Sequence, residues 1–331
     1  MHIAVIGAGA WGTALARLAA NQDHRTTLWA YEREVVDSIE ANRVNELFLS
    51  DVELPQGLRV TQDLEEAARG AEVVLTAVPS RHLRRIVNDL APHVSQDVLF
   101  VSASKGLEER TLLRMSEVIG GVMRERFEPR VVSLSGPTFA AEVARDRPTA
   151  LVAACKELEL AREIQHALSS LTFRIYANDD VVGVELGGAV KNVIAIAAGV
   201  SAGLGLGHNA VAALITRGLA EISRLSAALG GRKKTLAGLA GLGDLVLTCT
   251  GELSRNRGVG YELGRGTPLA SILASMRTVA EGVPTTHATV ALARRHGVEM
   301  PITFQMERLM RGETTPEKAI EELMSRRLKE E

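Results

Sequence analysis

The sequence predicts an α/β domain followed by an all-α domain. The chain has 331 residues, more than one ordinary domain. Short apolar runs alternate with amphipathic stretches up to about residue 178, and only helical patterns follow. We therefore expect domains at residues 1–178 and 179–331. The composition, 46% hydrophobic and 24% charged, is that of a globular protein with a real core.

Seven apolar runs in the first domain are expected to be strands. They are rich in Val, Ile and Leu, which is typical of parallel strands buried on both faces by helices. The runs are His2–Ile6, Thr26–Trp29, Val73–Val78, Val98–Ser102, Val131–Leu134, Ala150–Ala153 and Phe173–Tyr176. Helical patterns between them cover Gly12–Asn21, Glu34–Ala41, Leu64–Ala68, His82–Leu90 and Leu112–Met123.

Eight helical segments are expected in the second domain. An N-cap cluster, Asn178-Asp179-Asp180, precedes the first, and Thr315-Pro316 opens the last. The segments are 180–204, 209–229, 232–240, 254–264, 268–276, 281–296, 302–311 and 315–325.

Bulk properties exclude several classes of function. A net charge of −2 gives no general attraction to nucleic acid. Cys155 and Cys249 lie too far apart in sequence for a CxxC metal site, so we expect buried thiols and no metal. The N-terminus lacks the pattern of a signal peptide, and the most apolar stretch, Val190–Leu206, carries Lys191. We expect a cytoplasmic protein without membrane insertion.

A glycine-rich motif follows the first expected strand. Gly7, Gly9 and Gly12 form GxGxxG between the strand HIAVI and a helical pattern. In this context the three glycines serve a tight turn, close approach to a pyrophosphate and helix–strand packing. The helix N-terminus adds N–H groups and partial positive charge. The motif predicts a dinucleotide-binding Rossmann domain; a glycine turn without ligand is the alternative.

The end of the second strand bears on the choice of cofactor. Glu32 lies twenty residues past Gly12, where a Rossmann domain places the acid that binds the adenine ribose. Arg33 beside it would instead suit a 2′-phosphate, and a merely solvated charge pair is the third interpretation. The pattern favours NAD(H) over NADP(H).

Polar residues also follow later strands, where ligands collect in open α/β sheets. Pro79 and Ser80 end one strand, Lys105 and Gly106 follow the next, and Gly136 and Thr138 follow a third. An ordinary solvated lysine remains the alternative for Lys105.

The segment VELGGAVKNVI is unusual because it places Lys191 and Asn192 in an otherwise small and apolar helix. A lysine is costly to bury unless it is paired or functional. Desolvation favours the neutral amine, which can act as a general acid or base. A side chain that reaches the surface is the alternative.

Two further segments carry polar groups suited to a substrate. Asp244 lies between glycines and an apolar run. Ser254, Arg255 and Asn256 offer a hydroxyl, a guanidinium and an amide, which suit a phosphate, although Ser254 also suits a plain helix N-cap.

Together with several other segments, these motifs resemble those of the bacterial-type NAD(P)-dependent glycerol-3-phosphate dehydrogenases. The resemblance runs from residue 4 to about 305, and its more specific blocks are VELGGAVKN and GLGDL with SRNR. The segments are GAGAWGTALA, AVPS, SKGLE, SGPTFAAEV, VELGGAVKNVIAIAAG, NAVAALITRGLAEISRL, LAGLGDLVLTCT, SRNRGVG and EGVPTT. The resemblance implies a Rossmann domain, an all-α C-terminal domain of the 6-phosphogluconate dehydrogenase kind, and a homodimer.

The resemblance also implies an activity: reversible reduction of dihydroxyacetone phosphate to sn-glycerol 3-phosphate, which feeds glycerophospholipid synthesis. It makes Lys191 the catalytic proton donor or acceptor. The implied substrate-binding residues are Lys105, Gly136, Thr138, Lys191, Asn192, Asp244, Ser254, Arg255 and Asn256. The implied cofactor-binding residues are Gly7, Gly9, Ala10, Trp11, Gly12, Tyr31, Glu32, Lys105, Ala140, Arg255, Val279 and Glu281.

The sequence departs from the family pattern at two cofactor positions. Ala10 stands where the family often has Ser, which removes one hydroxyl contact. Tyr31-Glu32 stands where the family often has His-Arg, so an arginine that favours NADPH is replaced by an acid.

We expect the substrate to bind between the domains, with hydride delivered to its C2 carbonyl. In this hypothesis Lys191 protonates the alkoxide, Asp244 and Asn192 hold its ammonium, and Arg255 and Asn256 bind the phosphate. Two other functions remain open: a related dehydrogenase of an unphosphorylated hydroxy acid or sugar acid, and an NAD(H) sensor without turnover.

Overall fold

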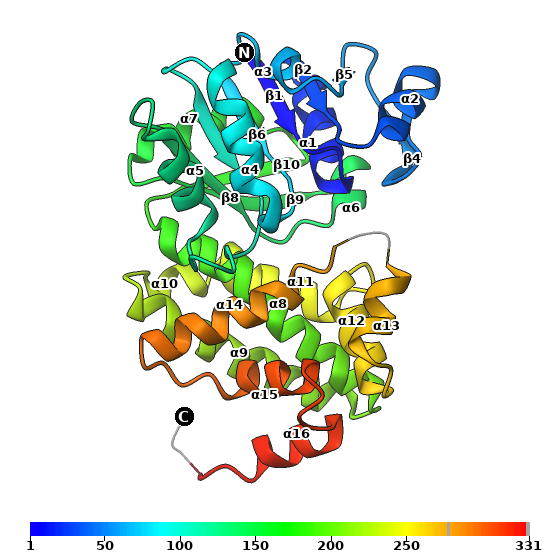
Figure 1. Cartoon of the computed structure of the whole chain (residues 1–331), viewed down its shortest axis with the longest axis vertical. Coiled ribbons are helices and arrows are strands. Elements are labelled where there is room, and N and C mark those ends of the chain that lie inside the picture. The colour runs from blue at the N-terminus through cyan, green and yellow to red at the C-terminus, as the bar shows by residue number, and fades with distance from the viewer. Residues whose placement is uncertain (277–278, 329–331) are drawn as a thin grey trace. The chain divides into compact units, whose positions relative to one another are not determined.

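The computed structural model describes residues 1–276 and 279–328. The chain divides into two compact units. The first unit comprises Met1–Lys105 and Leu113–Val184, and the second comprises Gly106–Leu112 and Glu185–Glu331. Figure 1 labels the elements of both. The prediction of an α/β domain followed by an all-α domain is confirmed; the exact boundary at residue 178 stays a prediction.

An eight-stranded sheet forms the centre of the first unit. Its strand order is β10-β9-β8-β7-β6-β1-β2-β5. The strands are β1 (His2–Ile6), β2 (Arg25–Trp29), β5 (Arg59–Thr61), β6 (Val73–Thr76), β7 (Leu99–Ser102), β8 (Arg130–Ser135), β9 (Thr149–Ala154) and β10 (Phe173–Asn178). All seven predicted strands are present, and β5 is an addition.

The sheet departs from the expected parallel arrangement at one pair. β8 pairs antiparallel with β9, while the other described pairs of this sheet are parallel. A parallel crossover normally needs a full helix between its strands, and the described connection from β8 to β9 contains only the five-residue α6 (Ala140–Ala144). The chain therefore returns in the opposite direction.

Helices cover both faces of this sheet (Figure 1). Alternate residues of each strand point to opposite faces, so Ile3 and Val5 enter one apolar core while Ala4 and Ile6 enter the other. The first core receives side chains from α1 (Ala10–Ala20), α2 (Arg33–Asn42), α6 and α7 (Leu158–Leu168). The second receives them from α3 (Leu64–Ala68), α4 (Ser80–Leu90) and α5 (Met115–Met123).

The sequence did not predict α6, α7 or a small hairpin. The hairpin joins β3 (Val44–Asn45) to β4 (Leu49–Glu53) in a separate two-stranded sheet. Leu47 and Phe48, at its turn, pack against the first core.

The second unit is built around α8 (Val181–Gly203), whose first four residues belong to the first unit. Asp180 caps this helix by accepting a hydrogen bond from Gly183 N–H at 2.9 Å, as the N-cap cluster predicted. Within the described residues, α8 is the one helix long and apolar enough to cross a membrane, but 83% of its most apolar window is buried in the protein. It is therefore the core helix of this unit.

Most of the other helices of the second unit match the predicted segments closely, but α10 ends at Leu236, four residues short of the predicted 232–240. They are α9 (Gly207–Ala228), α10 (Lys233–Leu236), α12 (Arg255–Gly264), α13 (Leu269–Ser275), α14 (Gly282–Arg295), α15 (Pro301–Met310) and α16 (Pro316–Met324). The structure adds a π-helical turn, η2 (Leu239–Gly243), which leads directly into α11 (Asp244–Thr250).

Glycines let α8 and α12 approach each other closely. A Cβ at Gly199 would lie 2.0 Å from the carbonyl oxygen of Arg257, and one at Gly260 would lie 1.9 Å from that of Ile196. No larger residue fits at either position without moving a backbone. This contact fixes the first turn of α12 against the helix that carries Lys191.

Candidate functional site

The glycine loop of the first unit has the geometry that a dinucleotide requires. Gly7 adopts φ +111°, and Gly12 packs so tightly that a Cβ there would lie 1.8 Å from the carbonyl oxygen of Gly7. Gly9 differs, since a Cβ there would meet no protein atom within 4 Å. The loop is therefore fixed at its two ends and open in the middle, where backbone can approach a pyrophosphate.

Helix α1 begins directly after this open glycine. Its first residues, Ala10 and Trp11, present the N-terminal N–H groups of a helix that carries no acidic residue in its first turn. The indole nitrogen of Trp11 is buried, and no partner for it is found in the described part of the chain. Open space, unused donors and a helix N-terminus together fit a dinucleotide.

The two residues weighed for cofactor choice differ in their surroundings. Glu32 is the N-cap residue of α2 without a side-chain capping bond, so its carboxylate is not used to cap the helix. Arg33 donates to Asp37 at 2.8 Å, one helical turn further on. The exposed ring of Tyr31 meets Trp29 edge-on, with 6.4 Å between ring centroids.

The structure brings together the predicted residues that follow β7 and β8. Lys105 Nζ donates to the carbonyl oxygen of Gly136 at 2.9 Å and lies 3.5 Å from Thr138 Oγ1. Gly136 has φ +154°, and a Cβ there would lie 2.7 Å from Leu151 Cβ, which requires glycine at this turn. Ala140 begins α6 shortly after. A lysine ammonium is thus held against a backbone turn of the sheet edge.

The buried charge of the second unit is Lys191. Lys191 lies in α8 and is 7% exposed, and Asp244 in α11 is 0% exposed. Lys191 Nζ donates to Asp244 Oδ1 and, at 2.7 Å, to Thr248 Oγ1. Thr248 in turn donates to the carbonyl oxygen of Asp244 at 2.6 Å. The ammonium is therefore held by a carboxylate and a hydroxyl, which offset its loss of hydration.

Asn192 does not hold this ammonium, so that part of the mechanism predicted from the sequence is wrong. Its Oδ1 accepts from Asn256 Nδ2 at 2.9 Å, and Asn256 Oδ1 accepts from Gly282 N–H at 2.9 Å. These bonds join α8, α12 and α14. The physical reason is helical geometry: Asn192 is one residue past Lys191 and its side chain leaves α8 in a different direction.

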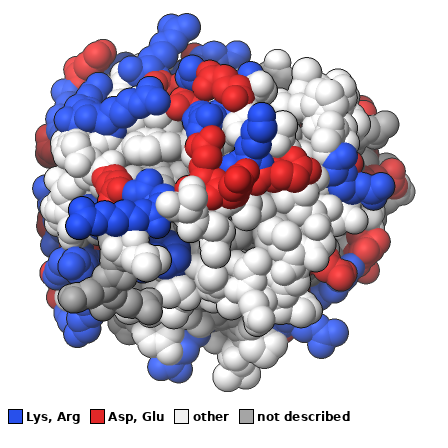
Figure 2. Space-filling view, turned by 90° about the horizontal axis from the view of Figure 1, so that it is seen from below, with Lys and Arg blue, Asp and Glu red and all other residues white. Residues whose placement is uncertain are grey.

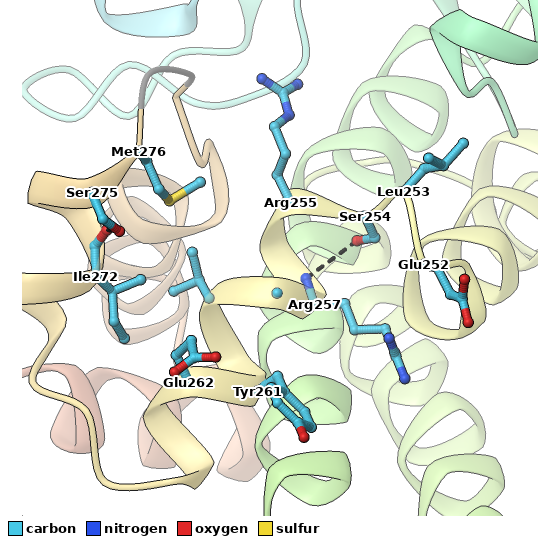
Figure 3. A pocket seen from close by; sticks show the side chains of 12 residues that line it. Glu252, Leu253, Ser254, Arg255, Arg257, Tyr261, Glu262, Ile272, Ser275 and Met276 are labelled. Atoms are coloured by element: carbon cyan, nitrogen blue, oxygen red, sulfur yellow. Dashed lines mark hydrogen bonds between the residues drawn. The ribbon is translucent and has the colours of Figure 1, made fainter.

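Ser254 and Arg255 stand at the N-terminus of α12. Ser254 accepts from Arg257 N–H at 3.2 Å, which is the N-cap bond that the sequence allowed (Figure 3). Figure 3 also shows Arg255 and Arg257 leaving the helix in opposite directions. Loss of solvation lowers the pKa of Arg255, and the negative charge of Glu281 opposes that shift. Glu281 and Val279 come immediately before α14.

A cavity of about 530 Å³ adjoins these residues in the second unit. Its lining is Glu252, Leu253, Ser254, Arg255, Arg257, Gly258, Val259, Tyr261, Glu262, Ile272, Ser275 and Met276. It contains Ser254 and Arg255 but neither Lys191 nor Asp244, so it is not by itself the site of chemistry.

Comparison with known sequences decides the family. The profile of the NAD-dependent glycerol-3-phosphate dehydrogenase N-terminus matches residues 2–161, and that of the C-terminus matches residues 180–321. The chain belongs to this family. It is an oxidoreductase of the NAD(P)-dependent glycerol-3-phosphate dehydrogenase type, as the sequence motifs predicted.

Individual relatives agree with this assignment. A glycerol-3-phosphate dehydrogenase (NAD(P)+) of Koribacter versatilis is 60% identical over 327 residues, which cover 98% of this chain and 97% of the relative. One from Citrifermentans bemidjiense is 52% identical over 329 residues, covering 99% and 98%. The crystal structure of glycerol-3-phosphate dehydrogenase from Coxiella burnetii is 40% identical and matches with a TM-score of 0.94, covering 98% of this chain and 99% of that one.

More distant structures share only the fold. A ketopantoate reductase from Ralstonia eutropha is 18% identical, with a TM-score of 0.63 over 97% of this chain and 100% of that one. Fold alone does not carry a substrate from one dehydrogenase to another.

One polar group that holds the Lys191 ammonium, the hydroxyl of Thr248, was not predicted from the sequence. Thr248 lies four residues after Asp244, one helical turn along α11, so its hydroxyl shares a face with that carboxylate. The i, i+4 spacing was the available signal. It was missed because the run DLVLTCT does not by itself distinguish a helix from a strand.

Proposed function

We propose that this chain catalyses the reversible reduction of dihydroxyacetone phosphate to sn-glycerol 3-phosphate with NADH or NADPH. The observation that carries the proposal is the Lys191 ammonium, buried in α8 and held by Asp244 and Thr248. Membership of the glycerol-3-phosphate dehydrogenase family supports the substrate. In the cell this reaction feeds glycerophospholipid synthesis.

The chemistry assigns Lys191 the proton. The cofactor, when bound, supplies the hydride to the C2 carbonyl carbon. Lys191 stabilises the charge that develops on the carbonyl oxygen and then donates a proton to it, which completes the secondary alcohol. Asp244 and Thr248 hold the amine in one position through both proton states, because each is buried and fixed on α11.

The remaining predicted residues bind the phosphate and the reacting carbonyl in this proposal. Arg255 supplies a guanidinium suited to bidentate contact with a phosphate. Asn256 Nδ2 has two hydrogens, and its bond to Asn192 uses one. Lys105, on the turn with Gly136 and Thr138, adds positive charge. Ser254, the N-cap residue of α12, belongs to the same proposed substrate-binding set.

The residues that we propose to bind the cofactor are centred on the glycine loop. Gly7, Gly9 and Gly12 with Ala10 and Trp11 would hold the pyrophosphate, and Tyr31 and Glu32 would meet the adenosine. Ala140, Arg255, Val279 and Glu281 complete the proposed set, together with Lys105.

We propose a preference for NADH. The Glu32 carboxylate suits a ribose hydroxyl and repels a 2′-phosphate, while Arg33 is already paired with Asp37. Comparing kcat/KM for NADH and NADPH in the wild type and in Glu32→Ser tests this. We expect the substitution to raise kcat/KM for NADPH; a wild type that already prefers NADPH contradicts the proposal.

We also propose a cytoplasmic homodimer. The first half of α9, residues 207–216, contains no Lys, Arg, Asp or Glu and is largely exposed, which is typical of a surface that another subunit covers. Figure 2 shows a broad area without charged side chains beside a region where both signs of charge mix. Two buried thiols suit a reducing compartment. Light scattering should give twice the 35.5 kDa of one chain.

A single assay tests the reaction itself. NADH oxidation is followed at 340 nm with dihydroxyacetone phosphate and, in parallel, with unphosphorylated dihydroxyacetone. We expect turnover with the phosphate ester and at least about 100-fold lower kcat/KM without it, because the remote phosphate orients the reacting carbon. Equal activity with both indicates a dehydrogenase of an unphosphorylated substrate. Tight NADH binding without any turnover indicates a sensor.

A further inference from the structure

The side chain of Asn45 lies against the glycine loop. Asn45 belongs to the β3–β4 hairpin and is 0% exposed. Its Nδ2 donates to the carbonyl oxygen of Ala8 at 2.8 Å and to Thr13 Oγ1 at 2.8 Å. Ala8 stands between Gly7 and Gly9, so a hairpin more than thirty residues further along the chain contacts the centre of the loop.

The orientation of this amide is fixed by its partners. Asn45 Oδ1 accepts from Phe48 N–H at 3.1 Å, on the opposite side from Ala8. A flipped amide would place two acceptors against each other at Ala8 and two donors against each other at Phe48. Both hydrogens of Nδ2 and the Oδ1 acceptor are therefore committed.

Thr13 completes a closed set of bonds. Its hydroxyl donates to the carbonyl oxygen of Ala8 at 3.2 Å and accepts from Asn45. Thr13 is itself buried in α1, and its N–H donates to the carbonyl oxygen of Gly9 at 2.9 Å. The carbonyl of Ala8 is thus held from two sides, by the hairpin and by the first turn of α1.

Holding this carbonyl determines where the next N–H points. In a planar trans peptide the N–H of Gly9 is antiparallel to the C=O of Ala8. Because the carbonyl points inward to Asn45 and Thr13, the Gly9 N–H points away from them. Gly9 is the open position of the loop, where a Cβ would meet no protein atom within 4 Å.

We propose that Asn45 is a positioning residue for the dinucleotide: its amide fixes the Ala8–Gly9 peptide so that the Gly9 N–H is presented to the pyrophosphate. The inference rests on the proposed cofactor role of the glycine loop and adds a residue from outside the loop. An unbraced peptide would have to be ordered by the cofactor on binding, at the expense of affinity.

The test compares Asn45→Ala with the control Asn42→Ala. Asn42 lies in the same segment, but within the described residues its side chain makes one exposed bond, to Glu46 at 2.7 Å. We measure the Kd of NADH by fluorescence titration and the KM values for NADH and dihydroxyacetone phosphate. Asn45→Ala should raise Kd and KM for NADH about 10-fold, and Asn42→Ala should change them less than about twofold.

A general loss of folded protein would lower the apparent kcat but would leave KM unchanged, so KM separates positioning from stability. An unchanged KM for NADH in Asn45→Ala, or an equal rise in both KM values, overturns the proposal. If Asn45→Ala does not fold, Thr13→Val decides, since it replaces the hydroxyl with a methyl group and so removes the bonds of Thr13 to Ala8 and Asn45; we expect about a threefold rise in Kd, and no rise overturns the proposal. A wild type that does not bind NADH would instead refute the cofactor role of the loop.

Discussion

The glycine loop and the Lys191 cluster are built in opposite ways. The loop presents backbone N–H groups, and its glycines matter because they lack side chains. The Lys191 cluster is made of side chains, contributed by α8 and α11, that are buried together. The loop depends on the absence of side chains at Gly7 and Gly12, whereas the cluster depends on single polar atoms.

The glycine loop and the Lys191 cluster also differ in what stabilises them. A backbone cradle is held by packing and by helix geometry, so it exists whether or not a ligand is present. A buried ion pair adds little net free energy to folding, because desolvation of both charges opposes their attraction. We infer that the cluster is retained for chemistry, and the loop for both folding and binding.

The largest expected effect comes from breaking the buried pair. Asp244→Ala leaves the Lys191 charge without its carboxylate and should lower the free energy of unfolding by about 3–5 kcal/mol. The double variant Lys191→Met/Asp244→Leu removes both charges and should recover most of that loss while remaining inactive. Urea denaturation measures both. A double variant less stable than Asp244→Ala would show that the pair is structural.

The next effect concerns volume in the loop. Gly12→Ala places a Cβ 1.8 Å from the carbonyl oxygen of Gly7, so the loop or α1 must move. We expect a loss of about 3 kcal/mol in the free energy of unfolding, typical of overpacking. Thermal unfolding of the variant checks this, and a Tm within about 1 °C of the wild type would show that the packing is not tight.

A third test uses a buried carboxylate that has no lysine partner among the residues that the structure describes. Glu221 in α9 accepts hydrogen bonds from Thr303 N–H and, at 3.0 Å, from Thr303 Oγ1, and also from Ile302 N–H at 2.6 Å, at the start of α15. Burial raises the pKa of Glu221 to about 7, although these hydrogen bonds oppose the shift. Asp244 differs because its charge is met by an ammonium.

The sign of the pH effect follows from this shift. Because the pKa of Glu221 is higher in the folded chain than its ordinary 4.5, its contribution to stability is fully present below pH 4.5 and is lost as the pH rises through about 7. The unfolding free energy of the wild type minus that of Glu221→Gln should fall by about 2–3 kcal/mol between pH 5 and pH 8. A pH-independent difference contradicts the assignment.

The smallest effect is expected at Thr248. Thr248→Val removes one hydrogen bond to Lys191 and leaves the ion pair with Asp244. The loss of one such bond, about 1 kcal/mol, should lower kcat about fivefold with little change in the KM for NADH. Steady-state kinetics measure it; a rise in that KM without a fall in kcat would place Thr248 outside the chemistry.

The contrast also explains what the sequence could predict. Gly7, Gly9 and Gly12 form one contiguous motif, and buried strands have the pattern of apolar runs. The loop and seven of the eight strands of the main sheet could therefore be predicted from the sequence. Lys191 and Asp244 were recognised as anomalies in apolar segments, although the partner of each depends on tertiary packing.

Other features were beyond local reasoning. The strand β5 has three residues, and the β3–β4 hairpin carries Asn45 in a mixed polar segment without a clear alternation. The antiparallel direction of β9 depends on how far a short connection can reach. Thr248 could not be predicted as a partner of Lys191 because helical spacing relates residues of one helix only, whereas the contact between α8 and α11 depends on tertiary packing.

The central claim is that cofactor binding and proton transfer reside in two separate structures, and one crossed measurement tests it. Gly9→Ala and Lys191→Ala are compared for the Kd of NADH and for kcat with dihydroxyacetone phosphate. Gly9→Ala should raise the Kd at least about 10-fold with an unchanged Tm, because its Cβ meets no protein atom but occupies the pyrophosphate space. Lys191→Ala should lower kcat by ~10²–10⁴-fold and leave the Kd within about twofold. A near-normal kcat in Lys191→Ala would contradict the account.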